Sequence, residues 1–354
     1  MGTIAIRADA SLQIGTGHVM RCLTLARALR DAGHEVLFIS RLLDGNFCDY
    51  IAGQGFPIAR LPRPSDAEST PDWLGLPWET DARQTEEAFD GLPRPIAWLI
   101  VDHYCLDARW ERALRPKIER ILAIDDLADR RHDCDLLLDQ NLGRNAADYS
   151  ELVPPGSLVM AGPRYAMLRQ EFTQWREHSL ARSRWPLRRI LISMGGVDKD
   201  NATSTVLDVL ENSPRIAGAE IEIIMGQHSP WLAQVKSRAA HMPHASVHVN
   251  VGNMAERMAD SDLSIGAAGA SSWERCCLGL PTLTVILADN QRSGAFAMDA
   301  SGVQLTIGTQ NETAQNLAEK LSSLNQHTMT SMSQNSRVLV DGLGVQRVVE
   351  AMHA

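Results

Sequence analysis

The stretch TIAIRADASLQIGTGHVMRCLTLARALRDAG, Thr3–Gly33, decides the fold of the first part of the chain. It begins with a short run of β-branched and small apolar residues, Thr3–Arg7, which predicts a strand. A glycine-rich loop, Ala10–Gly17, follows, and His18–Ala32 then keeps apolar residues at helical spacing until Gly33 ends the helix. Strand, glycine loop and helix in this order are typical of a βα unit.

Further units of the same kind follow along the chain. We predict strands at His34–Ser40, Trp98–Asp102, Arg120–Asp125, Leu136–Asp139, Arg189–Ser193, Glu220–Met225, Val247–Asn250, Leu263–Gly266, Thr282–Ile286 and Gln304–Ile307. Helical patterns lie between these runs, and this alternation predicts an α/β protein with mainly parallel sheets. Because a strand, a glycine loop and a helix open both halves, the sequence predicts two Rossmann-like doubly wound domains that face a central cleft.

The length and a polar connecting segment predict where the domains divide. A chain of 354 residues exceeds the usual size of one core, which favours two domains. We place an N-terminal domain at 1–168, a connecting segment with charged and aromatic residues at 169–188, and a C-terminal domain at 189–354. The last of these ends in a helical tail from about Asn311 onward.

Composition excludes several classes of partner. The chain has 34 Lys and Arg against 43 Asp and Glu, a net charge of −9, without a block of like charge. This balance argues against nucleic acid or an anionic membrane as the main partner. The N-terminal residues lack a cationic flank and an apolar core, and no apolar run is long enough to span a membrane, so we expect a cytoplasmic protein. The six cysteines form no CxxC pair and are expected to be reduced.

The first motif with chemical potential is the loop that ends in Gly15-Thr-Gly17-His18. The two glycines let the backbone turn tightly and approach a ligand, and the helix behind them presents unpaired N–H groups to an anion. His18 lies in the first helical turn, where the dipole favours a neutral ring that can accept a proton. A capping or merely exposed histidine is the alternative. The spacing differs from GxGxxG, which argues against a dinucleotide site.

Two glycine and serine motifs in the second half are also candidates. Gly195 and Gly196 end a predicted strand just before a helix, where backbone amides suit a diphosphate, although an ordinary βα turn is equally consistent. The second motif is Gly269-Ala270-Ser271-Ser272-Trp-Glu274. Glu274 could accept hydrogen bonds from both hydroxyls of a ribose, or could only compensate a helix dipole.

Other candidates carry a weaker signal. Asp102-His103-Tyr104 and Asp125-Asp126 stand at the carboxyl ends of predicted strands, where they could bind a sugar or satisfy loop backbones. Five tryptophans are expected to be packing residues and not a stacking platform, namely Trp73, Trp78, Trp98, Trp110 and Trp175. No cluster of ligating side chains has metal spacing, and we expect neither a metal nor a cofactor.

Taken together, seven runs of sequence resemble the UDP-2,4-diacetamido-2,4,6-trideoxy-β-L-altropyranose hydrolases of pseudaminic acid biosynthesis. They are RADASLQIGTGHVMRCLTLA, VDHYCLD, IDDLADRRHDCDLLLDQN, GPRYAMLRQEF, ISMGGVDKDN, GASSWERCCLGLPT and ADNQ, in this order from about Ile4 to about Asn290. The combination of IDDLADRRHDCDLLLDQN with GTGH is specific, whereas each of the other motifs alone is not. Two residues depart from the pattern, because Cys105 replaces an expected glycine and Gln170 an expected proline.

The resemblance implies a GT-B architecture, similar to that of the N-acetylglucosaminyltransferase of peptidoglycan synthesis, with UDP on the second domain and the sugar and catalytic base on the first. It places the catalytic base at His18 and the ribose-binding acid at Glu274. The residues that it places around the substrate are Arg7, Asp9, Gly15, Gly17, Arg21 and Tyr104 on the first domain, and Gly195, Gly196, Gly269, Ala270, Ser271, Ser272, Asn290 and Gln291 on the second.

The implied reaction is hydrolysis of a UDP-sugar to free sugar and UDP, with inversion at the anomeric carbon. UDP is a good leaving group, so a single base acting on water suffices and a dedicated acid is not required. Two alternatives stay open: a UDP-sugar-dependent glycosyltransferase with the same fold, and a non-catalytic nucleotide-sugar sensor. The expected partner is a small-molecule UDP-sugar, and the sequence leaves the oligomeric state open.

Overall fold

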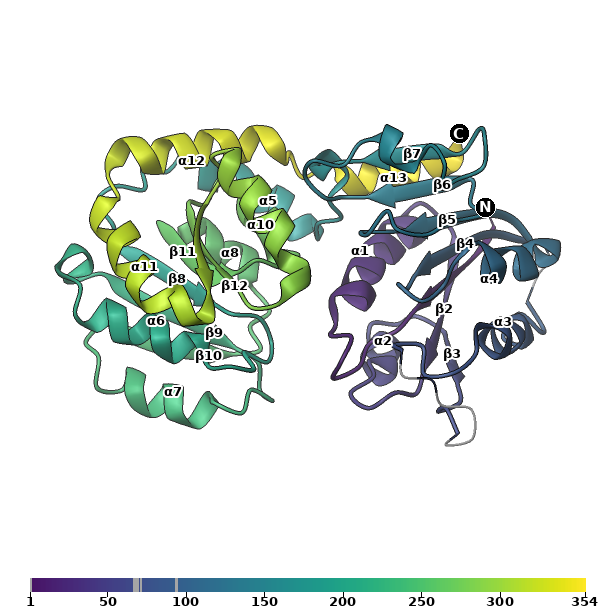
Figure 1. Cartoon of the computed structure of the whole chain (residues 1–354), viewed down its shortest axis with the longest axis horizontal. Helices are drawn as coiled ribbons and strands as arrows, with labels where there is room; N and C mark the ends of the chain where they lie inside the picture. Colours follow the sequence, from purple (N-terminus) through teal and green to yellow (C-terminus); the bar gives the residue numbers. More distant parts are fainter. Residues whose placement is uncertain (1, 66–69, 71, 93–94) are drawn as a thin grey trace. The chain divides into compact units, whose positions relative to one another are not determined.

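A computed structural model of the chain describes residues 2–65, 70, 72–92 and 95–354. The described residues divide into two compact units, Met1–Met167 with Leu343–Ala354, and Leu168–Gly342. Each unit is a three-layer arrangement of helices on both faces of a parallel sheet (Figure 1). Each is described by itself below.

The first unit is built on seven parallel strands among the described residues, in the order β3-β2-β1-β4-β5-β6-β7. The strands are β1 Thr3–Ala8, β2 Glu35–Arg41, β3 Ile58–Leu61, β4 Ile96–Asp102, β5 Ile118–Ile124, β6 Leu136–Asp139 and β7 Leu158–Ala161. The helices are α1 Gly17–Asp31, α2 Cys48–Gly53, α3 Trp78–Glu87, α4 Ala108–Leu114 and α13 Gly344–His353.

Alternate residues of its strands face opposite layers, as the two-residue period of a strand requires. Ile4 and Ile6 of β1 pack in a core with Val19 and Leu23 of α1, whereas Ala5 faces a second core that contains Trp110 of α4. Both faces are therefore covered, which is the usual state of a parallel sheet.

The second unit repeats this plan with six parallel strands among the described residues, in the order β10-β9-β8-β11-β12-β13. The strands are β8 Arg189–Ser193, β9 Glu220–Met225, β10 Ala245–Val249, β11 Leu263–Ala267, β12 Thr282–Ile286 and β13 Leu305–Thr309. The helices are α5 Gln170–Ala181, α6 Ala202–Glu211, α7 Leu232–Ala239, α8 Met254–Asp260, α9 Ser271–Cys277, α10 Arg292–Ala300, α11 Gln310–Ser323 and α12 Gln326–Leu339.

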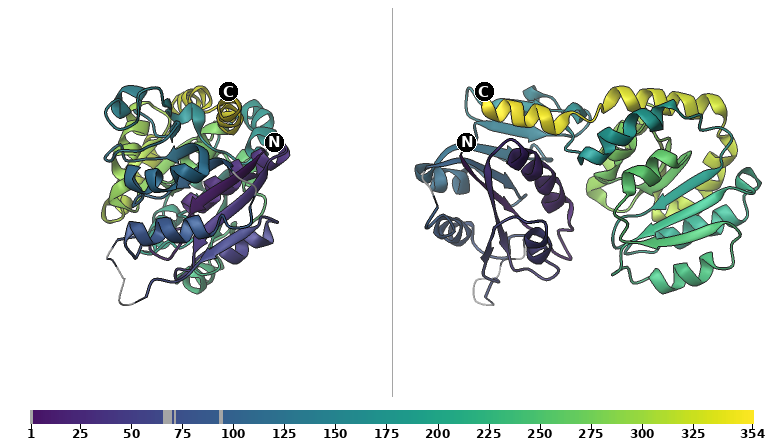
Figure 2. Two further views of the ribbon diagram at one scale, coloured as in Figure 1. Left: turned by 90° about the vertical axis from the view of Figure 1, so that its right-hand side faces the viewer. Right: turned by 180° about the vertical axis from the view of Figure 1, so that it is seen from behind.

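Two features differ from the boundaries expected from sequence. The helical tail does not stay with the second unit: α13 packs along α1 of the first unit, where Val348 and Met352 are buried (Figure 2). The connecting segment is not a separate linker, because α5 groups with the second unit and contacts α8 and α9. In both cases an amphipathic helix covers an apolar surface, and its sequence does not specify which one.

Candidate functional site

Both sheets change strand order next to their first strand, and in doubly wound folds ligands bind at the carboxyl ends of the strands at such a point. In the first unit this point lies between β1 and β4, where Ala8 pairs with Asp102. In the second unit it lies between β8 and β11, where Ser193 pairs with Gly266. The predicted motifs follow these four strands.

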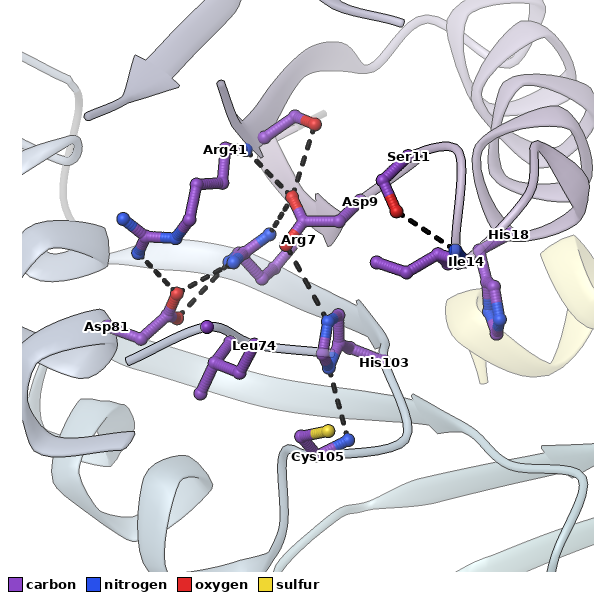
Figure 3. Close-up of polar contacts among 12 residues, drawn as sticks. Arg7, Asp9, Ser11, Ile14, His18, Arg41, Leu74, Asp81, His103 and Cys105 are labelled. Atoms are coloured by element: carbon purple, nitrogen blue, oxygen red, sulfur yellow. Dashed lines mark hydrogen bonds and ion pairs between the residues drawn. The ribbon is translucent and has the colours of Figure 1, made fainter. Parts of the chain in front are cut away.

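The loop after β1 carries His18 into the first turn of α1. Gly15 has a φ of +79°, and the hydroxyl oxygen of Ser11 accepts a hydrogen bond from the Ile14 N–H at 2.9 Å (Figure 3). A Cβ added at Gly15 or Gly17 would meet no described atom within 4 Å, so the loop backbone is open to a ligand. The positive φ explains why glycine is used at Gly15.

His18 contacts a carboxylate from the neighbouring strand. Its Nδ1 lies 2.6 Å from Oδ1 of Asp102, the last residue of β4, and both side chains are buried. Because a carboxylate can only accept, Nδ1 carries the proton and Nε2 of His18 has the free lone pair. The geometry is that of a histidine general base oriented by an aspartate.

Asp102 stays ionised because the guanidinium of Arg21 faces it. Arg21 donates from Nε to Oδ2 at 2.6 Å and from Nη2 to Oδ1 at 2.7 Å. Burial alone would raise the pKa of Asp102, but Arg21 and His18 hold it well below its ordinary value. The carboxylate is therefore charged at neutral pH and can stabilise an imidazolium at His18.

Tyr104 extends this cluster. Its hydroxyl donates to Oδ2 of Asp126 at 2.7 Å, and Arg21 donates to Oδ1 of the same carboxylate at 3.0 Å. The Tyr104 ring meets the His18 ring edge-on, with 4.7 Å between centroids. Burial, reinforced by Asp126, raises the pKa of Tyr104, so its hydroxyl is a hydrogen-bond donor and not a base.

Trp73 packs against the aromatic side chains of this cluster. Its ring stacks on Tyr104 at 5.3 Å between centroids and lies edge-on to His18 at 6.4 Å. The side chain is only partly buried. Trp73 and Tyr104 thus form an aromatic wall beside the histidine, and the described contacts of Trp73 are packing contacts, as expected from the sequence.

Arg7 and Asp9 also require a correction. Both side chains are fully buried, and Arg7 donates to Asp9 at 2.6 Å and to Asp81 at 2.7 Å (Figure 3). Asp9 accepts a further bond from the backbone N–H of Arg41. A group with no accessible surface cannot contact a sugar directly. These residues therefore support the base of the loop that carries His18, and do not line a sugar pocket as predicted.

In the second unit the loop after β8 leaves its backbone accessible. Gly195 has a φ of +85°, and a Cβ at Gly195 or Gly196 would meet no described atom within 4 Å. The carboxylate of Asp198 accepts hydrogen bonds from the backbone N–H groups of Ala202 and Thr203 and thus caps α6. The two predicted glycines therefore lie exposed next to the beginning of a capped helix.

The loop after β11 places the predicted serines at the start of α9. Gly269 is half-buried with open space at its Cβ position, Ala270 is exposed, and Ser271 and Ser272 begin the helix. Glu274 lies one turn on, 3.4 Å from Nη2 of Arg169. Burial raises the pKa of Glu274, and Arg169 opposes that rise.

Asn290 and Gln291 belong to a single 3₁₀ turn, Asp289–Gln291. Asn290 is exposed, whereas Oε1 of Gln291 accepts a hydrogen bond from the Leu287 N–H at 3.1 Å. Gln291 thus has one side-chain oxygen committed to its own loop, and its amide nitrogen is the group left for a ligand.

Two acidic residues at this site were named only as weak candidates from the sequence, Asp102 and Asp126. They stand 84 and 108 residues after His18 in the sequence, and local spacing says nothing about such a pairing. The adjacency of β1, β4 and β5 brings them together. Within the described part of the chain no group of three or more His, Cys, Asp or Glu has the geometry of a metal site, and no helix is long and apolar enough to cross a membrane.

Comparisons with known proteins agree with this architecture. Residues 191–348 match the model of the glycosyltransferase family 28 C-terminal domain. UDP-2,4-diacetamido-2,4,6-trideoxy-beta-L-altropyranose hydrolase of Campylobacter jejuni is 27% identical over 85% of this chain and 98% of its own length. An uncharacterized protein of Methanocaldococcus jannaschii is 25% identical over 82% of this chain but 56% of its own length, so the chain spans about half of that relative.

Among solved structures, the crystal structure of Acinetobacter baumannii MurG matches with a TM-score of 0.71 and 17% identity, over 100% of this chain and 99% of that one. The fold predicted from the sequence, with two Rossmann-like domains of the GT-B kind, is confirmed. The resemblance predicted from the motifs is confirmed as well, and the chain is a GT-B-like protein similar over most of its length to the UDP-diacetamido-trideoxy-altropyranose hydrolase.

Proposed function

We propose that this protein hydrolyses a UDP-linked 2,4-diacetamido-2,4,6-trideoxy sugar to the free sugar and UDP, as a step of pseudaminic acid biosynthesis. The observation that carries the proposal is the pair of His18 and Asp102 at the point where the first sheet changes strand order. The similarity to the C. jejuni hydrolase supports the choice of substrate class.

His18 is the proposed base. Nε2 accepts a proton from water, and the water oxygen forms a bond to the anomeric carbon while the bond from that carbon to the UDP oxygen breaks. The electron pair of the broken bond leaves with UDP, and attack from the opposite face inverts the configuration. Asp102 stabilises the imidazolium, which afterwards returns its proton to solvent.

The second unit is proposed to bind the nucleotide. The open backbone at Gly195 and Gly196 and the hydroxyls of Ser271 and Ser272 offer donors for a diphosphate whose negative charge grows as UDP departs. Glu274 is the proposed acceptor for the ribose hydroxyls, in exchange for its contact with Arg169. Asn290 and the amide nitrogen of Gln291 are the remaining groups proposed to contact the substrate.

The aromatic wall of Trp73 and Tyr104 supports a sugar with apolar substituents. A 6-deoxy sugar with two acetamido groups presents three methyl groups, and aromatic faces bind such groups better than they bind hydroxyls. The Tyr104 hydroxyl and Arg21 supply polar contacts at the edge of the same wall.

A second candidate is a glycosyltransferase, which the match to the family 28 C-terminal domain favours. It would use the same base on the hydroxyl of an acceptor in place of water. Fold does not separate the two reactions.

The test is to incubate the full chain with a panel of UDP-sugars and follow sugar and UDP by NMR. We expect free sugar and UDP from the UDP-2,4-diacetamido-2,4,6-trideoxy sugar without any acceptor, and little turnover of UDP-N-acetylglucosamine. Turnover that requires an added acceptor would establish the glycosyltransferase instead. Binding of UDP-sugars without turnover of any would leave a nucleotide-sugar sensor.

A further inference from the structure

Arg275, on α9 of the second unit, is a buried cation that forms no ion pair with any described residue, although the charge of Glu274 acts on it from beyond ion-pair distance. Its side chain is 2% exposed, and among the described residues no carboxylate lies within ion-pair distance of it. The neighbouring carboxylate of Glu274 is paired with Arg169 instead. An unpaired charge inside a protein is costly, so its retention calls for an explanation.

The guanidinium lies at the point where the second sheet changes strand order. A Cβ added at Gly266 of β11 would come within 2.9 Å of Nη1 of Arg275 and equally close to the carbonyl oxygen of Ser193, at the end of β8. The absence of a side chain at Gly266 therefore leaves room for the guanidinium beside the paired strands β8 and β11. This is the place at which a doubly wound sheet receives its ligand.

The contacts of Arg275 turn two hydroxyls into donors. Nη1 donates to the Ser271 hydroxyl oxygen at 3.1 Å, and Nη2 donates to that of Ser272 at 2.9 Å. A hydroxyl that accepts from a cation has its own O–H left to give, and neither O–H donates to another described residue. Polarisation by the guanidinium strengthens both donors. Nε of Arg275 is buried and has no partner among the described residues.

A second buried arginine of the same unit, Arg184, has the contacts expected of a purely structural residue. Arg184 is 6% exposed and donates to the carbonyl oxygens of Ser179, Ser261 and Leu278. These three carbonyls lie at the carboxyl ends of α5, α8 and α9, whose dipoles offset the charge.

Burial lowers the pKa of Arg184 and of Arg275 alike to about 10, so both are charged at neutral pH. Among the described residues, Arg275 donates to one backbone carbonyl oxygen, that of Ala267 at the end of β11. It therefore lacks the helix carboxyl ends that offset the charge of Arg184.

We propose that Arg275 is a positioning residue for an anionic ligand, the diphosphate of a nucleotide, whose charge offsets the buried guanidinium and whose oxygens accept from the hydroxyls of Ser271 and Ser272. The proposal rests on the proposed function, because it assigns a new member to the nucleotide site. The serine hydroxyls would touch the ligand, and Arg275 would orient these hydroxyls from behind.

The test is calorimetric titration of the full chain with two probes, UDP and uridine. For Arg275→Met we expect the Kd for UDP to rise about ten- to one hundredfold, the scale of a lost charged hydrogen-bond network, while the Kd for uridine changes by less than about threefold. Arg275→Lys keeps the charge but not the forked donation, and we expect it to recover part of the UDP affinity.

Arg184→Met is the matched control, since it removes an equally buried cation from the same unit. It should lower the melting temperature and leave the ratio of the UDP and uridine dissociation constants unchanged. An equal loss of UDP and uridine affinity in Arg275→Met would overturn the inference, because it would show a structural role. Unchanged UDP affinity in that variant would overturn it too.

A second variant keeps the proposal testable if Arg275→Met does not fold. Ser271→Ala combined with Ser272→Ala retains the cation and removes both hydroxyls, and we expect the same selective loss of UDP affinity. Wild-type affinity for UDP in this double variant would overturn the inference without touching the proposed hydrolysis. A wild-type protein that binds neither UDP nor uridine would instead contradict the proposed function, and this inference with it.

Discussion

The two units share one strand topology, but the points where their sheets change order carry opposite chemistry. In the first unit His18, Arg21, Asp102 and Asp126 form a closed set in which every charge has an opposite neighbour. In the second unit the corresponding loops offer glycine backbone and two hydroxyls, and α9 adds an arginine that forms no ion pair with any described residue. A cluster whose charges are paired suits proton transfer, whereas a cation without an ion-pair partner suits the binding of an anion. The same strand topology can thus carry a proton-transfer site in one unit and an anion-binding site in the other.

The largest expected effect comes from removing the base. For His18→Asn, which keeps a polar side chain in the first turn of α1 but has no titratable nitrogen, we expect kcat to fall 10²-fold or more, the usual scale for a general base. UDP affinity should be unchanged, since the second unit is proposed to hold the nucleotide. Steady-state kinetics and calorimetry measure the two quantities. His34→Asn, which removes the histidine that pairs with His353, is the control and should retain the wild-type rate.

The next effect tests the orientation of that base. In Asp102→Asn the amide can donate to Nδ1 of His18, which would reverse the ring tautomer and leave Nε2 protonated. We expect kcat to fall by about 10²-fold with KM little changed. Rate constants for Asp102→Asn close to those of the wild type would show that His18 does not depend on this carboxylate, and the comparison of the two units would lose its first half.

A smaller effect is expected from the ribose contact in the second unit. Glu274→Ala removes the proposed acceptor and leaves Arg169 without its partner. UDP binding should weaken by about 1–3 kcal/mol, the scale of unpaired polar groups in a desolvated site. Calorimetry with UDP measures this. Glu171→Ala, which removes another acidic partner of Arg169, is the matched control. Equal UDP affinity in Glu274→Ala and the wild type would move ribose recognition to other residues.

The smallest effect concerns stability in the first unit. Burial lowers the pKa of His103 to about 4, with Asp9 acting in the opposite direction. The unfolded chain therefore binds a proton near pH 6.5 that the folded protein does not accept until about pH 4, so the free energy of unfolding falls as the pH decreases through this window.

Between pH 7 and pH 5.5 the contribution of His103 to this loss should be about 1 kcal/mol, and other groups such as Asp139, whose pKa burial raises to about 6, act in the same window with the opposite sign. The measurement is therefore the difference between the wild type and His103→Gln, which is neutral at every pH, by urea unfolding at both pH values. An identical change in unfolding free energy between the two pH values in both proteins would contradict the assignment.

Sequence alone predicted the alternation of strands and helices and the loops that follow β1, β8 and β11, because glycines and apolar periodicity are local signals. It missed β3 and β7, which are four residues long and lie at the two edges of their sheet. Both runs are short, and the charged Arg60 interrupts the apolar residues of β3. The pairing of His18 with Asp102 depends on strand adjacency, which no local spacing encodes.

Burial is the other property that the sequence could not supply. Arg7 and Asp9 have the composition of a polar binding loop, and only their lack of exposed surface and the ion pairs of Arg7 with Asp9 and Asp81 show that they are interior. In the sequence, Arg275 has the appearance of an ordinary helix residue. Only the structure shows that its guanidinium occupies the space next to Gly266 that a larger side chain would fill. In both cases the sequence shows that the residue is charged, but only the packing shows that its side chain is buried and therefore which role it has.

The central claim is that a water activated by the first unit attacks the sugar, while the second unit holds the nucleotide that leaves. Turnover of the UDP-2,4-diacetamido-2,4,6-trideoxy sugar in ¹⁸O-labelled water tests it directly by mass spectrometry of both products. We predict that the label enters the free sugar, that UDP stays unlabelled, and that NMR finds the first-formed anomer inverted. Label in the terminal phosphate of UDP would show attack at phosphorus and would contradict the role given to His18.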